Sequence, residues 1–93
     1  MAARIDVEER APGTFQVTVG EGGSRTTHTV TVDAAYARGL AGDSDHAELV
    51  RRSFEFLLER EPKESILSSF ALPVIGRYFP EYEREIRRRL AGA

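Results

Sequence analysis

The chain has 93 residues, of which 13 are basic and 15 are acidic, and it contains no cysteine and no tryptophan. A length of this order fits one domain, and the lack of cysteine excludes a disulfide framework, a thiolate metal site and a cysteine nucleophile. With 41% hydrophobic and 30% charged residues, the composition is that of a folded domain, and a net charge of −2 excludes a globally basic nucleic-acid binder.

Residues 4–33 alternate between apolar and polar side chains with a period of two, which predicts a three-stranded antiparallel meander. The strands are expected at about 4–10, 14–20 and 25–33. Strict alternation rich in β-branched residues is typical of half-buried strands. Pro12 and Gly13 mark the first turn, and the glycine-rich residues 20–24 mark the second. One face of this sheet is predicted to be aliphatic and the other threonine-rich.

Residues 33–42 predict a helical turn that follows the sheet. Asp33 is the expected cap at its start, and Gly39 is the expected stop. A second capping pattern follows, because Asp45 precedes Glu48 by three residues, as in a capping box. A longer helix is therefore predicted to begin at this point.

That helix is amphipathic and is predicted over about residues 45–60. Its apolar positions are Val50, Phe54, Leu57 and Leu58. Pro62, Pro73 and Pro80 punctuate the remaining residues 62–92, which predicts three short helices. Their inward-facing residues are expected to be Ile66, Leu67 and Phe70, then Val74, Ile75, Tyr78 and Phe79, then Tyr82, Ile86 and Leu90.

The order of the elements predicts an α+β fold, because a run of strands precedes a run of helices. We expect a single domain over residues 1–93, with a sheet half at 4–33 and a helical half at 43–92. The helices are predicted to pack on one face of the sheet.

Candidate chemical sites are few. The glycines of residues 20–24 precede a strand and no Gly-Lys-Ser/Thr, so they predict a hairpin loop and no phosphate site. The acidic residues 43–48 lack the third ligand and the glycine of a calcium loop. His28 and His46 are single histidines, and no Gly-x-Ser-x-Gly surrounds the serines at 65, 68 and 69. The sequence therefore predicts no metal, no cofactor and no catalysis.

Basic residues concentrate in the second half of the chain. Residues 51–93 hold 9 basic and 7 acidic side chains, whereas residues 1–50 hold 4 and 8. The arginines that are candidates for contacting a nucleic acid or an acidic partner are Arg77, Arg84, Arg87, Arg88 and Arg89. Together with Tyr78 and Tyr82 they could neutralise phosphates and stack on bases. The favoured interpretation is local pairing with glutamates at i+3 or i+4: Glu81–Arg84, Glu83–Arg87 and Glu85–Arg89.

Phe54 and Phe56 point in directions about 160° apart on a helix, so both cannot face the same core. Phe56 is therefore expected either to pack under the C-terminal helices or to meet a partner. The two edges of a three-stranded sheet offer a further place for another chain to pair.

The run from Ser53 to Leu67 (SFEFLLEREPKESIL), continued by VIGRYFPEY at 74–82, resembles a family of short prokaryotic proteins with no established activity. The likeness extends over about residues 28–85 and includes HTVTV at 28–32. The resemblance implies no catalytic or binding residue. Ala71 stands where relatives carry an aspartate, which implies a lost cap before the third helix.

We expect a small cytoplasmic protein, because no secretory signal and no membrane helix is predicted. Its predicted role is a non-catalytic protein–protein interaction module, with a homodimer as one form of that interaction, and a nucleic-acid-associated regulator is the alternative. The candidate interaction residues are Phe56, Arg77, Tyr78, Tyr82, Arg84, Arg87, Arg88 and Arg89.

Overall fold

Alternating residues in the first third of the chain form the strands that were expected there. The computed structural model describes residues 3–92. Its strands are β1 (Arg4–Ala11), β2 (Thr14–Glu21), β3 (Ser24–Thr31) and β4 (Ser69–Ala71). Its helices are α1 (Ala34–Ala41), α2 (His46–Leu58), α3 (Val74–Tyr78) and α4 (Tyr82–Gly92), with a 3-10 turn η1 (Lys63–Ser65) after α2. The α+β class is confirmed.

The first three strands form the predicted antiparallel meander, and Val17 on β2 lies opposite Val7 on one side and His28 on the other. The two hairpins turn at glycines with positive φ, which side chains other than glycine adopt with strain. Gly13 has a φ of 78°, and a Cβ atom there would lie 3.0 Å from the Val32 carbonyl oxygen. Gly22 and Gly23, with φ of 61° and 84°, form the second turn.

The sheet has a fourth strand, so the prediction of three strands is incomplete. β4 pairs in parallel with β3, through Val30 opposite Phe70, and the strand order is β1-β2-β3-β4. The prediction of a helix after Pro62 is wrong beyond η1. Ser68 and Ser69 are poor helix formers, and the backbone from the Ser68 carbonyl to the Leu72 amide forms hydrogen bonds with the free edge of β3.

Two aspartates cap the helices as predicted. The Asp33 carboxylate accepts a hydrogen bond from the Tyr36 amide at 3.0 Å, and the Asp45 carboxylate accepts one from the Glu48 amide at 3.3 Å. The predicted stop at Gly39 is wrong. The helix α1 continues to Ala41, and its C-cap residue is Gly42, whose φ is 61° and whose amide donates to the Arg38 carbonyl.

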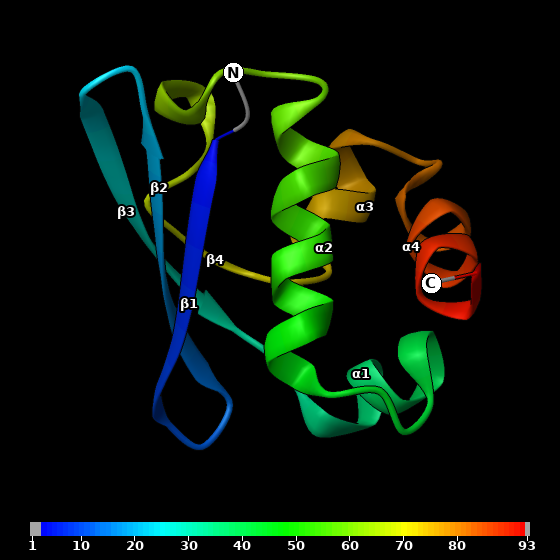
Figure 1. Ribbon diagram of the computed structural model, residues 1–93. Helices are drawn as coiled ribbons and strands as arrows, with labels where there is room; N and C mark the ends of the chain where they lie inside the picture. The colour runs from blue at the N-terminus through cyan, green and yellow to red at the C-terminus, as the bar shows by residue number, and fades with distance from the viewer. Residues whose placement is uncertain (1–2, 93) are drawn as a thin grey trace.

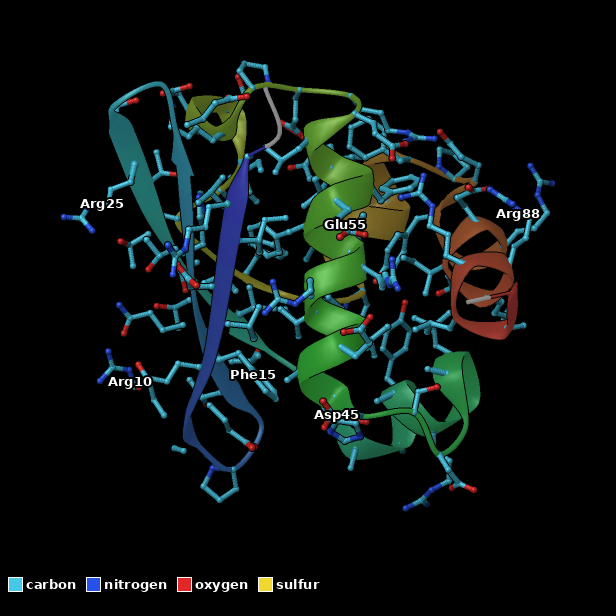
Figure 2. All side chains as sticks on the ribbon, in the orientation of Figure 1. Arg10, Phe15, Arg25, Asp45, Glu55 and Arg88 are labelled. Atoms are coloured by element: carbon cyan, nitrogen blue, oxygen red, sulfur yellow. The ribbon has the colours of Figure 1, made fainter. Side chains whose placement is uncertain are left out.

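The molecule has three layers, with α2 between the sheet and α4 (Figure 1). Phe15 on β2 points toward α2, whereas Arg10 and Arg25 project from the opposite, threonine-rich face of the sheet (Figure 2). Apolar residues on both faces of α2 join one continuous hydrophobic core. In residues 3–92 no helix has the length and apolar character that crossing a membrane requires.

Candidate functional site

The C-terminal half of the chain forms an apolar groove of about 390 Å³, which we call the α3 groove. Its walls come from the end of α2, from η1 and the segment up to β4, and from α3. The residues that line it are Leu57, Glu61, Ser65, Ile66, Leu67, Phe70, Val74, Ile75, Tyr78 and Phe79. Residues as far apart in the sequence as Leu57 and Phe79 therefore build one surface.

Hydrogen bonds to β3 position the middle wall of the groove. The imidazole Nδ1 of His28 donates to the Leu67 carbonyl at 2.7 Å, because a carbonyl oxygen can only accept. The Thr29 amide donates to the Ser68 carbonyl at 2.8 Å. Because these bonds hold the backbone at the edge of the sheet, Phe70 points into the core while the Leu67 side chain stays 47% exposed. The prediction that Leu67 faces inward is therefore wrong.

Tyr78 lines the groove from α3 and, at 67% exposure, stands at its rim. The prediction that it faces inward is wrong, although its place among the candidate interaction residues agrees with this exposure. The helix α3 has only five residues, and Ile75 is the one that it buries fully. Tyr78 occupies the last position of this short helix, and its side chain is not covered by the rest of the fold. In the described part of the chain, Leu67 and Tyr78 are the two exposed large hydrophobic residues.

His28 is buried between the sheet and α2, where its ring lies 5.4 Å from that of Phe54. Its Nε2 lies 2.8 Å from the Thr26 hydroxyl, so both ring nitrogens have protein partners. The histidine thereby tethers the wall of the groove to the sheet. Among residues 3–92, no three histidine or acidic side chains are grouped so that they could hold a metal ion.

Phe56 and Tyr82 are fully buried, so the prediction that they contribute to an exposed interaction surface is wrong. Phe56 lies on the face of α2 that is turned toward α4. Its ring centroid is 5.4 Å from that of Tyr82 and 5.9 Å from that of Phe79. The guanidinium of Arg60 lies 3.6 Å from the same ring centroid. The first of the two expectations for Phe56, packing under the C-terminal helices, is the one that the structure confirms.

The hydroxyl of Tyr82 meets Ser53 on α2 at 2.6 Å, and the Ser53 hydroxyl donates to the Leu49 carbonyl at 2.8 Å. Tyr82 is therefore the donor in the first of these bonds. Burial raises the pKa of Tyr82 above its ordinary value.

The arginines of α4 divide into paired and unpaired residues. Arg89 contacts Glu85 at 3.1 Å, as predicted, and it also contacts Glu59 on α2 at 2.6 Å. Arg88 also pairs with Glu85 and projects away from the helix (Figure 2). Hydrogen bonds from Arg88 and then Arg89 lower the pKa of Glu85 from 4.5 to about 2. These contacts occupy two of the five candidate arginines.

The other two predicted pairs do not form. Glu81 pairs with Arg60 at 3.1 Å, and Glu83 accepts the Tyr36 hydroxyl at 2.8 Å. Desolvation and this hydrogen bond raise the pKa of Tyr36 above its ordinary value. Over residues 3–92, the candidate arginines that form no ion pair are Arg77, Arg84 and Arg87.

Of the residues that line the α3 groove, only Tyr78 was among the candidate interaction residues from sequence, and the polar Glu61 and the exposed Leu67 were both missed. The alternation of small residues with large apolar ones over 69–72 (Ser, Phe, Ala, Leu) is the sequence signal that could have predicted a strand just after Leu67. No local pattern marks Glu61, because its place in the groove depends on contacts with α3.

Known proteins offer no guide to the function of this arrangement: no family model matches the chain, and no curated protein or solved structure is significantly similar to it. The resemblance to a family of short prokaryotic proteins therefore stays a prediction.

Proposed function

We propose that this protein is a protein–protein interaction module and that the α3 groove is its docking surface. One observation carries the proposal: Leu67 and Tyr78, the two exposed large hydrophobic residues of the described part of the chain, both line the same apolar groove. Contiguous exposed apolar surface rimmed by polar residues marks interaction sites, because water contact with it is unfavourable. Tyrosine is also among the residues that contribute most to binding at protein interfaces.

The test is photo-crosslinking in living cells, with a benzophenone amino acid in place of Tyr78. Arg25, on the opposite face of the sheet, is the matched control position. We expect a discrete protein adduct from position 78 and none from position 25. Equal or absent adducts at the two positions would overturn the proposal.

Nucleic-acid binding is the alternative, and it is favoured by the unpaired state of Arg84 and Arg87 within residues 3–92. Against it, Arg88 and Arg89 are already paired with glutamates. Fluorescence anisotropy with single-stranded RNA and DNA at low salt separates the two functions. Binding that falls steeply with salt and is lost in Arg84→Glu would support the alternative.

A further inference from the structure

We infer that the occupant of the α3 groove is a second copy of this chain, related by two-fold symmetry, with Tyr78 of each copy in the groove of the other. The inference rests on the proposed function and names its partner. A two-fold interface requires one surface that is complementary to itself. The α3 groove meets this requirement because it presents both a hollow and, on its own rim, an exposed aromatic ring.

The charges around the groove support this choice of partner. Residues 57–81 carry seven charged side chains: Glu59, Arg60, Glu61, Lys63, Glu64, Arg77 and Glu81. Five of them are neutralised within the chain, since Arg60 contacts Glu81, Arg89 contacts Glu59, and Lys63 contacts Glu64 at 2.7 Å. Within the described residues, Glu61 and Arg77 have no ion-pair partner.

These two unpaired charges are opposite in sign and lie at complementary places. Glu61 lines the groove, and Arg77 directly precedes Tyr78, the ring that would fill it. An occupant suited to this groove therefore needs an apolar ring next to a cation. The chain itself presents that pair, and a two-fold arrangement would form two Glu61–Arg77 contacts, one from each copy.

Sedimentation velocity over a wide concentration range tests the inference. An interface centred on a few side chains is at the small end of the size range, so we expect a weak, concentration-dependent dimer. Tyr78→Ser should raise the dimer Kd by about tenfold or more, because the substitution removes the central ring twice per dimer. Circular dichroism of each variant checks that the fold is retained.

A charge exchange makes the test specific for the pairing. Glu61→Arg and Arg77→Glu should each weaken the homodimer by about fivefold, because each converts two attractive contacts into two repulsive ones. A mixture of the two variants should associate more strongly than either alone, since the heterodimer regains two attractive contacts. Arg25→Glu is the matched control and should leave the dimer unchanged.

A wild-type chain that remains monomeric at all concentrations would overturn the inference, and so would a dimer that Tyr78→Ser does not weaken. A mixture of the charge variants that gains no affinity would also overturn it. The proposed function fails separately: an adduct at position 78 with a different protein, beside a monomeric chain in solution, would retain the interaction module and remove the dimer.

Discussion

Phe56 illustrates how a single residue obtains its environment from elements far away in the sequence. Its ring points away from the sheet, yet it is fully buried by Tyr82, Phe79 and the guanidinium of Arg60. Arg60 is held in place by Glu81 and by the Phe56 carbonyl. An arginine that spreads its plane over an aromatic ring excludes water from it while keeping its own charge solvated.

Tyr82 gives the prediction at this scale. Tyr82→Phe removes the buried hydroxyl that donates to Ser53 and should lower the free energy of unfolding by about 1 kcal/mol. The measurement is urea-induced unfolding followed by circular dichroism. Tyr78→Phe is the matched control, because the Tyr78 side chain is exposed. Equal stabilities for the two variants would contradict the role of the Ser53 bond.

At the scale of elements, α4 is attached to α2 by charges as well as by apolar packing. Arg89 bridges Glu85 on its own helix and Glu59 on α2. Its hydrogen bond is the largest cause of the lowered pKa of Glu59, and it also lowers that of Glu85. Two of the glutamates that were predicted to pair with arginines of α4 contact other elements instead. Glu81 contacts Arg60 after α2, and Glu83 accepts the hydroxyl of Tyr36 on α1.

The lowered pKa values predict a pH dependence of stability. A carboxylate whose pKa is lower in the folded state stabilises the fold above its ordinary pKa, and this contribution is lost as the pH falls through the folded value. For Glu85 the loss takes place between pH 4.5 and about 2. Arg89→Gln should therefore destabilise the protein near neutral pH, and the difference from wild type should shrink as the solution is acidified.

Urea unfolding from about pH 7 to about pH 3 measures this difference. Arg84→Gln is the control, since Arg84 forms no ion pair in the described part of the chain. A difference for Arg89→Gln that stays constant across the whole pH range would contradict the electrostatic explanation.

For the molecule as a whole, the position of α2 between the sheet and α4 affects the cooperativity of unfolding. Phe54 contacts His28 and Phe70 on the side of the sheet, and Phe56 contacts the C-terminal helices on the other side. The core is continuous through α2. Neither layer can bury its apolar face without this helix, so we expect the sheet and α4 to unfold together.

Phe56→Leu tests this expectation. The smaller side chain should reduce stability by about 1–2 kcal/mol. Hydrogen exchange should show an equal loss of protection at Val17 on β2 and at Ile86 on α4, although only α4 lies near the substitution. A loss confined to α4 would show that the helical layer opens independently of the sheet.

The features that sequence alone determined are those with short-range causes. The period of two in residues 4–33 predicted the meander, because alternate side chains of a strand face opposite sides. Asp33 and Asp45 predicted helix starts, since a cap needs only a carboxylate and an amide three residues apart. The interaction role that the sequence predicted for Arg77 and Tyr78 stays a prediction.

Long-range contacts decided the rest. The segment that includes Leu67 has apolar spacing compatible with a helix, and it became extended because β3, about forty residues earlier, offered it an unpaired edge. Phe56 and Tyr82 became core because α4 folds back onto α2. The α3 groove, with Glu61 inside and Tyr78 on its rim, forms where the end of α2, the segment from η1 to β4 and α3 meet. The spacing of residues within any one of these segments does not predict the groove.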